Sequence, residues 1–306
     1  MSRIHEALKK AEQERASQVA SGAPQAVADL MPAYQSVSGL GKQVAELAAR
    51  AARKPEGAAF LSFDDLVKRC AHPTWQLDPR IETHPKTEEG QIGAERFRTL
   101  RSRLYQIAAT RLLKRVLVTS SVKAEGKTFV AGNLAHSMVR QQDRHVLLID
   151  ADLRASRLHQ LLGAPSGPGL ADYLRGEANE YEVIQNPMGG NLFFIPGGSQ
   201  VSNPSELLLN ERMKNLLDLV TPIFDWIVLD SPPALPVHDA SNLADICDGV
   251  LFVVRSGKTP HQVAERASSD FLKKNLLGVV LNGVEKGNAY YGYYDSYASP
   301  EQETVK

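Results

Sequence analysis

A glycine-containing loop between two predicted elements constrains the fold of this chain most strongly. The loop covers residues 121–128, with the sequence Ser-Val-Lys-Ala-Glu-Gly-Lys-Thr. It follows the apolar run Val116–Thr119 and precedes a segment with helical spacing of its apolar residues. The loop fits the pattern G-x-x-x-x-G-K-[ST] except at its first position, where Ser121 replaces Gly. This order of strand, loop and helix predicts one unit of a parallel α/β sheet.

The same alternation of apolar and helical segments continues through the chain. The expected strands are 116–119, 146–149, 192–195, 226–229, 250–254 and 278–281. They lack polar alternation, which is typical of strands buried on both faces. Long helices are expected at 88–109 and 205–219, the second with Asn203 as N-cap, Pro204 in the first helical position and Glu206 at capping-box spacing. The sequence therefore predicts a mostly parallel sheet covered by helices on both faces.

Composition limits the partners that this chain requires. Its 306 residues carry 35 Lys and Arg against 35 Asp and Glu, so the net charge gives no sign of a nucleic-acid partner. The two cysteines, Cys70 and Cys247, form no metal pattern and suit a reducing compartment. No run of about 18 apolar residues is present, and the N-terminus lacks the apolar core of a signal peptide. We therefore expect a cytoplasmic protein that reaches a membrane only through a partner.

Three regions are expected along the chain. Residues 1–86 form an N-terminal extension, residues 87–284 the α/β domain, and residues 285–306 a polar tail rich in tyrosine. The extension is interpreted as a short amphipathic helix (1–15), a linker (16–40), a second helix (41–54) and an irregular segment (55–85).

The loop carries the features of an ATP phosphate site. Gly126 lets backbone N–H groups approach phosphate oxygens, Lys127 reaches the β- and γ-phosphates, and Thr128 can bind Mg²⁺. The following helix directs its positive end at the same anion. The expected nucleotide contacts are Ser121, Ala124, Glu125, Gly126, Lys127, Thr128 and Phe129. Lys123 and Ala124 depart from the usual small residues of such loops.

Carboxylates follow two of the apolar strands. Asp150 and Asp152 end the strand at 146–149, and Asp230 ends the strand at 226–229. Because the carboxyl ends of parallel strands meet at one edge of a sheet, these side chains are expected to converge beside the phosphates. Thr128, Asp152 and Asp230 are the candidate Mg²⁺ ligands. Asp150 is the candidate base for an acceptor hydroxyl, although the sequence leaves the division of roles between Asp150 and Asp152 open.

These motifs resemble the bacterial tyrosine kinases of capsule and exopolysaccharide synthesis. The resemblance covers roughly 87–298 and includes Asp-x-Asp-x-Arg at 150–154 and Asp-x-Pro-Pro at 230–233. It implies a P-loop fold, ATP and Mg²⁺ as cofactors, and autophosphorylation of a C-terminal tyrosine cluster. It also implies a ring-like oligomer formed through a Glu-x-x-Arg-x-x-Arg helix, here Glu95, Arg98 and Arg101. The implied partners are a membrane polysaccharide co-polymerase as activator and a cognate tyrosine phosphatase.

The tail supplies the expected acceptors. Five of the nine tyrosines lie there: Tyr290, Tyr291, Tyr293, Tyr294 and Tyr297. They are interspersed with polar residues and glycine and show no apolar period, which favours an accessible acceptor segment over a packed one.

Three further side chains have two interpretations each. Asn282 resembles the adenine-reading Asn of related ATPases, or is a turn residue. Arg255 lies along the nucleotide, or is a surface cation. Arg154 meets phosphate, or forms an ion pair with a neighbouring acid.

We therefore expect an ATP-dependent protein-tyrosine autokinase that regulates polysaccharide polymerisation and export. One alternative is a partition- or cell-division-type positioning ATPase, which would place an extra lysine where this chain has Val122. The other is a scaffold whose assembly is controlled by the nucleotide. Transfer of phosphate to tyrosine separates the three.

Overall fold

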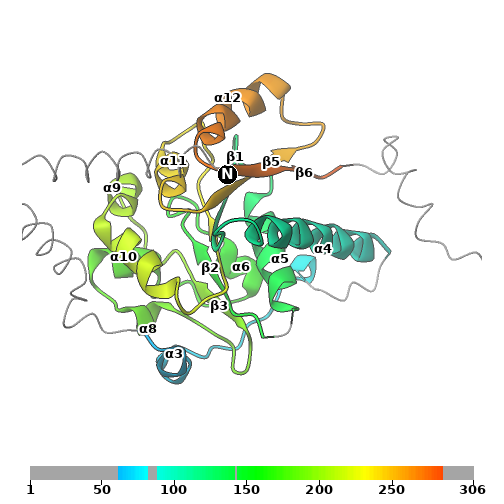
Figure 1. Ribbon diagram of the computed structural model, residues 1–306. Coiled ribbons are helices and arrows are strands. Elements are labelled where there is room, and N and C mark those ends of the chain that lie inside the picture. The colour runs from blue at the N-terminus through cyan, green and yellow to red at the C-terminus, as the bar shows by residue number, and fades with distance from the viewer. Residues whose placement is uncertain (1–60, 82–87, 142, 285–306) are drawn as a thin grey trace, which may run out of the picture. The chain divides into compact units, whose positions relative to one another are not determined.

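The computed structural model describes residues 61–81, 88–141 and 143–284. Its centre is a six-stranded sheet in which every pairing is parallel (Figure 1). The strands are β1 (Arg115–Ser120), β2 (Val146–Asp150), β3 (Leu192–Ile195), β4 (Trp226–Asp230), β5 (Gly249–Arg255) and β6 (Leu276–Asn282). The helices are α3 (Phe63–Arg69), α4 (Glu88–Ala108), α5 (Lys127–Val139), α6 (Leu158–Leu162), α7 (Leu170–Arg175), α8 (Glu180–Val183), α9 (Pro204–Leu208), α10 (Glu211–Val220), α11 (Asp239–Ala244) and α12 (His261–Leu272), with a 3₁₀ turn, η1, at Pro79–Ile81. All six expected strands and the fold class are confirmed.

Strand order places the phosphate loop at the centre of one edge of the sheet. The order is β3-β2-β4-β1-β5-β6, so β1 lies between β4 and β5. The register pairs Asp150 with Asp230 at the ends of β2 and β4, and Val118 of β1 with Asp230. Loops that leave β1, β2 and β4 therefore begin side by side, at the edge where open α/β sheets bind ligands.

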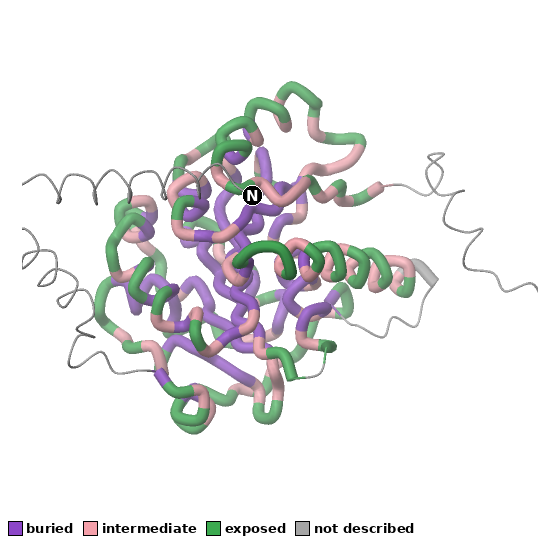
Figure 2. Tube along the Cα trace, in the orientation of Figure 1, coloured by how far each residue is buried: buried purple, intermediate pink, exposed green. Residues whose placement is uncertain are grey.

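Alternate residues of each strand pack on opposite faces of the sheet. One face is covered by α4, α5 and α6 and buries residues such as Val118, Leu148 and Val228. The other is covered by α3 and α7 to α12 and buries residues such as Leu147 and Leu229. The strands form the buried centre in Figure 2, with helices on both sides. Burial of both faces explains why the strand sequences lack polar alternation.

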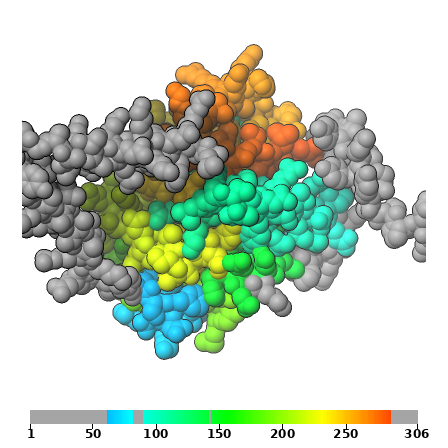
Figure 3. Space-filling view, in the orientation of Figure 1, coloured from blue at the N-terminus to red at the C-terminus, as the bar shows by residue number. Residues whose placement is uncertain are grey.

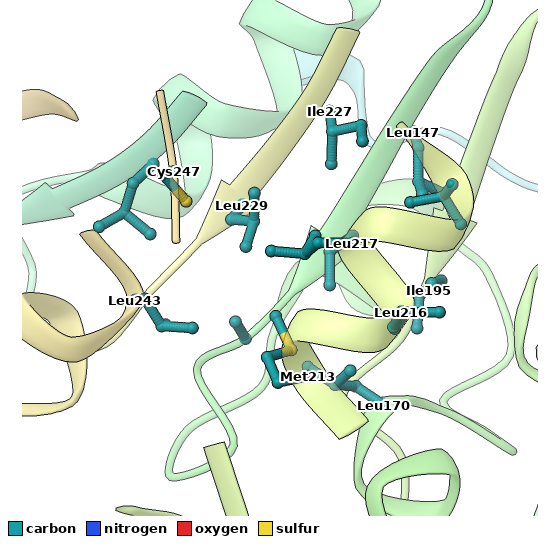
Figure 4. Packing of buried hydrophobic residues seen from close by; sticks show 14 of the residues in the cluster. Leu147, Leu170, Ile195, Met213, Leu216, Leu217, Ile227, Leu229, Leu243 and Cys247 are labelled. Carbon is teal, nitrogen blue, oxygen red and sulfur yellow. The ribbon is translucent and has the colours of Figure 1, made fainter. Parts of the chain in front are cut away.

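The face opposite α5 is built mainly from aliphatic side chains. Figure 4 shows Leu216, Leu217 and Met213 of α10 directed at residues of the strands, including Leu229. A fully buried aliphatic side chain is worth roughly 1.5–3 kcal/mol relative to an exposed one. This packing holds the strand ends, and therefore the carboxylates that follow them, in fixed positions.

Residues 61–81 belong to this domain. Ser62 caps α3, whose Leu66 is fully buried. Trp75 packs edge-on against Phe194 of β3, with ring centroids 6.1 Å apart. Ile81 is also fully buried and contacts α5 so closely that a Cβ on Gly132 would lie 2.8 Å from its Cδ1. Residues 61–81 therefore pack on the same domain as the sheet, and the segment interpreted as irregular contains the helix α3.

The helix expected at 205–219 is in fact two helices. α9 ends at Leu208, and α10 begins at Glu211 with Asn210 as its N-cap, whose side chain accepts a hydrogen bond from the Arg212 N–H. Asn203 makes no side-chain cap and instead donates to Glu206 at 3.2 Å. The apolar spacing of the sequence continues across this break and conceals it, and the Asn210 cap marks where the second helix starts.

α4 lies on α5 and remains at the surface on its outer side (Figure 3). Leu104 is buried, and Phe97, Leu100 and Ile107 pack partly buried against the same core, as the expected stripe requires. The expected helices at 1–15 and 41–54 and the tyrosine tail lie outside the described residues. Within the described ranges no helix is long and apolar enough to cross a bilayer.

Candidate functional site

Two residues of the phosphate loop adopt a positive φ. Gly126 has φ 97°, and a Cβ at this position would lie 1.9 Å from Nδ2 of Asn282. Glycine is therefore required there by conformation and by space. Ala124 also adopts a positive φ, 66°, which disfavours a residue with a side chain by about 1–2 kcal/mol. Ala124 is therefore a position of backbone strain within the loop.

Lys127 connects the loop to two strand-end carboxylates. Its ammonium lies 2.7 Å from Oδ2 of Asp152 and 3.6 Å from Oδ1 of Asp230. Burial alone would lower the pKa of Lys127, but the two carboxylates outweigh burial and raise it. The lysine is therefore charged and held inside the site. Sequence placed all three residues at this edge, and the structure brings them together.

Asp230 is buried without a hydrogen-bond partner. Its side chain is almost wholly inaccessible, and neither oxygen accepts a hydrogen bond of normal geometry from the described residues. Burial raises the pKa of Asp230 and outweighs the opposing effect of Lys127. An anion in this condition is a suitable binding position for a cation or an ordered water.

The donor set of the site fits Mg²⁺ together with a nucleotide. Asp152, Asp230 and the Thr128 hydroxyl are oxygen ligands of the kind Mg²⁺ prefers, and the Thr128 Oγ1 lies 3.4 Å from the Lys127 ammonium. Within the part of the chain that the structure describes, no three His, Cys, Asp or Glu side chains form a complete metal cage. Mg²⁺ would therefore need phosphate oxygens or waters to complete its coordination, as is usual for this ion.

Asp150 is occupied by the loop that follows β2. Its Oδ2 accepts hydrogen bonds from the Ser156 hydroxyl at 2.7 Å and from the N–H groups of Arg157 and Leu158 at 3.1 Å each. Its Oδ1 accepts from the Asp152 N–H at 3.2 Å. Burial raises the pKa of Asp150, against the lowering by the Ser156 hydrogen bond. With four donors on one carboxylate, Asp150 orders the loop and presents Asp152 to Lys127.

Arg154 takes the ion-pair option that the sequence left open. Its Nε lies 2.8 Å from Oδ2 of the buried Asp239, and its other nitrogen donates to the Ser205 hydroxyl at 2.7 Å. Ser205 in turn donates to Asp239 at 2.5 Å. Arg154 thereby joins the loop after β2 to α9 and α11 and does not point freely at the phosphate loop.

Asn282 and Arg255 lie beside the loop from β6 and β5. The Asn282 amide donates to the backbone oxygen of Glu125 at 2.8 Å, so it is more than a turn residue. The Arg255 N–H lies 3.4 Å from Oε1 of Glu125. Phe129, in contrast, packs edge-on against Phe97 of α4 with centroids 5.9 Å apart, which gives it a packing role. Ser121 is buried, and its hydroxyl has no partner among the described residues.

The expected interface residues on α4 divide into two groups. Arg98 and Glu95 pair with each other at 2.5 Å and are more than half exposed. Arg101 is partly buried and donates to the backbone oxygen of Ser137 on α5 at 2.6 Å. Glu95 and Arg98 are therefore available to another molecule, whereas Arg101 also holds α4 on its own domain.

Sequence reasoning missed the supports of the site. Ser156 binds Asp150, Asp239 binds Arg154, and Thr259 donates to Glu125 at 2.5 Å. Asp239 and Thr259 are distant in sequence from their partners, whereas Ser156 lies six residues after Asp150. The only sequence signal was their position shortly after a strand or motif, which does not identify a partner.

The comparisons with known proteins agree with this geometry. Residues 115–263 match the model of an AAA domain family. The chain is 34% identical over 211 residues to YwqD, a tyrosine-protein kinase of Bacillus subtilis (strain 168), covering 68% of this chain and 89% of YwqD. It is 33% identical to the tyrosine-protein kinase wzc of Salmonella typhi over 67% of this chain but only 29% of wzc, so it spans less than a third of that longer relative.

A solved structure gives the same result. The kinase domain of the Escherichia coli tyrosine kinase ETK is 34% identical, with a TM-score of 0.59 over 63% of this chain and 76% of that domain. The parallel sheet, the phosphate loop and the strand-end aspartates thus occur together with similarity to almost the whole of YwqD. By its fold, its site and its similarity, the chain belongs to the bacterial tyrosine-protein kinases.

Proposed function

We propose that this chain transfers the γ-phosphoryl group of ATP to tyrosines of its own C-terminal tail. The observation that carries the proposal is the buried arrangement of Lys127 between Asp152 and Asp230, in which neither oxygen of Asp230 accepts a hydrogen bond of normal geometry from the described residues. A cation and two anions held at the phosphate loop match the needs of phosphoryl transfer, which depends mainly on positioning and charge neutralisation.

Each side chain of the site has a role in this proposal. Lys127 binds the phosphates, and Gly126 together with the start of α5 offers backbone N–H groups to them. Thr128, Asp152 and Asp230 would hold Mg²⁺, which neutralises charge on the phosphate oxygens when it is bound. The free phenol has a pKa near 10, so a carboxylate that accepts its proton assists the reaction. Asp150 and Asp152 are the two candidates for that role: Asp150 accepts four hydrogen bonds, and Asp152 pairs with the Lys127 ammonium and accepts from the Ala155 N–H.

The packing of the other tyrosines supports the tail as acceptor. In the described part of the chain, Tyr105 stacks on Trp226, Tyr173 is buried, and Tyr181 lies under the Arg69 guanidinium. Tyr173 and the Tyr105 hydroxyl are thus buried, and one face of the Tyr181 ring is covered. The acceptors proposed are Tyr290, Tyr291, Tyr293, Tyr294 and Tyr297. From Asn282 to Tyr297 an extended chain spans roughly 50 Å, enough to reach its own site or that of a neighbouring copy.

We further propose a role in polysaccharide polymerisation and export. The relatives that support it include wzc of Salmonella typhi and a putative tyrosine-protein kinase encoded in the cps region of Klebsiella pneumoniae. The proposed activator is a membrane co-polymerase, which would recruit this chain to the inner face of the membrane. Self-association through Glu95 and Arg98, and a cognate phosphatase that resets the tail, complete the proposed cycle.

The test is formation of phosphotyrosine by purified protein with labelled ATP and Mg²⁺. Wild type is expected to become labelled, and Lys127→Met is expected to lose the label together with ATP binding. Lys273→Met, which removes an exposed lysine at the end of α12, serves as the matched control. Equal labelling of Lys127→Met and wild type would reject the assignment of the site.

A further inference from the structure

Glu125 is an unexpected residue to find inside a phosphate-binding loop. It precedes Gly126, and its side chain is 2% exposed. A buried carboxylate next to an anion site opposes binding of that anion, unless its charge is directed at other groups. The contacts of Glu125 show where its charge is directed.

The carboxylate of Glu125 closes the loop on itself and ties it to the neighbouring strand. Oε2 accepts from the Val122 N–H at 2.7 Å, so one loop amide is bound within the loop. Oε1 accepts from the Thr259 hydroxyl at 2.5 Å and faces the Arg255 N–H at 3.4 Å. Both of these partners belong to the end of β5 or to the turn that leads into α12.

The backbone of the same residue is held from a third direction. The Asn282 amide, at the end of β6, donates to the Glu125 carbonyl at 2.8 Å. Asn282 also lies so close to Gly126 that no side chain fits between them. Glu125 is therefore the point at which the loop after β1 meets the ends of both β5 and β6.

We propose that Glu125 is a positioning residue that preforms the phosphate loop and links its shape to the β5 and β6 ends. The inference rests on the nucleotide site of the proposed function. The carboxylate holds the Val122 N–H in the loop conformation before a nucleotide arrives, so binding does not have to order this part of the loop. Loss of the link should therefore weaken nucleotide binding without removing any group that touches phosphate.

The chemistry of the contacts separates three variants. In Glu125→Gln, the amide oxygen can accept from Val122, and the Thr259 hydroxyl can rotate to accept from the new amide. Only the long contact from the Arg255 N–H loses its acceptor, so most of the link survives. Thr259→Val removes the hydroxyl that donates to Oε1 of Glu125, and leaves the longer contact from the Arg255 N–H and the Asn282 bond to the Glu125 carbonyl in place. In the double variant Glu125→Gln with Thr259→Val, the buried amide group has no acceptor from Thr259, which costs more than either change alone.

The experiment measures affinity for the Mg²⁺ complex of a non-hydrolysable ATP analogue by calorimetry. Glu125→Ala and Thr259→Val are expected to weaken binding about tenfold, the loss typical of one hydrogen bond to a charged group. Glu125→Gln should bind within about threefold of wild type, and the double variant should lose more than the product of the single losses.

Asp172→Asn is the matched control. Asp172 is also a buried carboxylate, and it lies in α7, away from the phosphate loop. It accepts hydrogen bonds from the N–H groups of Gly169 and Ser199 and from the Ser199 hydroxyl. It should lower thermal stability and leave analogue affinity unchanged. If Glu125→Ala does not fold, Thr259→Val and the double variant decide the question.

The possible results are distinct. Analogue affinity of Thr259→Val and of the double variant equal to that of wild type would overturn the positioning role and leave the proposed function intact. A wild-type protein that binds no analogue would overturn the nucleotide site itself, and with it both proposals.

Discussion

Asp230 illustrates at the scale of one residue how a binding site opposes stability. The strand that precedes it is buried on both faces, and packing therefore fixes the carboxylate in the interior. Burial raises its pKa, which means that its ionised form is unfavourable in the folded protein. A charge retained under these conditions is expected to serve a ligand.

Asp230→Asn should therefore make the ligand-free protein more stable and inactive. At pH 8 the wild-type Asp230 is ionised, and burial of this charge lowers the stability of the folded protein. In the presence of EDTA, the midpoint of thermal unfolding of the variant should therefore exceed that of wild type by a few degrees, at about 2–4 °C per kcal/mol for a domain of this size. As the pH falls through the raised folded pKa, the wild-type carboxyl takes up a proton more readily folded than unfolded, so the difference should shrink.

The control for this prediction is Asp218→Asn. Asp218 is half exposed and pairs with Arg115, so its removal should give no gain. Equal or lower stability of Asp230→Asn at pH 8, with phosphotyrosine formation retained, would contradict the account of Asp230.

Single residues of the site were predictable where the pattern is local. Lys127, Asp152 and Asp230 follow from a loop motif and from strands that end in aspartate, and the parallel sheet brings them together. The role of Asp150 was not predictable, because three of its four donors lie in the loop at 156–158 and depend on how that loop folds. Arg154 likewise required knowledge of Asp239, 85 residues away.

At the scale of elements, the break between α9 and α10 depends on one cap. Asn210 accepts from the Arg212 N–H, whereas Asn203 accepts no such bond at the start of α9. Asn210→Ala should lower the free energy of unfolding by about 1 kcal/mol, the usual value of an N-cap side chain. Asn203→Ala should cost clearly less. Chemical denaturation of both variants measures the difference, and the reverse order would show that the first cap is the important one.

The exposed pair on α4 gives the second prediction at this scale. Glu95→Ala with Arg98→Ala removes the two outward side chains and keeps Arg101, which holds α4 on α5. If this surface joins copies of the chain, the double variant should be monomeric by light scattering, with unchanged thermal stability. The pair itself, being exposed, contributes roughly 0–1 kcal/mol to folding.

A matched variant keeps this test specific. Arg103→Ala removes another exposed charge of α4 and should leave the mass distribution of wild type. If Glu95→Ala with Arg98→Ala has the same mass distribution as wild type, the pair is a solvated surface ion pair and does not join copies of the chain.

At the scale of the whole molecule, the sheet was predictable and its N-terminal boundary was not. Six uncharged apolar runs separated by helical spacing specify a parallel sheet almost directly. Residues 61–81 carry two prolines and only one short α-helix, and their place in the fold comes from contacts with distant parts of the chain, such as Trp75 on Phe194. No local pattern records such contacts.

Truncation tests whether residues 61–81 are part of the folded domain. A chain that begins at Phe60 should unfold at nearly the temperature of the full chain, since the compact unit starts there. A chain that begins at Thr87 loses the buried Leu66 and Ile81 and exposes the side chains beneath them, which should cost at least about 3 kcal/mol at the usual value for buried aliphatic groups. Equal thermal midpoints for the two truncated chains would restore the later boundary.

The most direct test of the central claim is to map phosphate on wild-type protein after incubation with ATP and Mg²⁺. Mass spectrometry of the digested protein should find phosphotyrosine within Tyr290–Tyr297, and a variant with all five tail tyrosines changed to Phe should stay unlabelled while still binding ATP. Phosphate on Tyr34, Tyr105, Tyr173 or Tyr181, with an unmodified tail, would contradict the account.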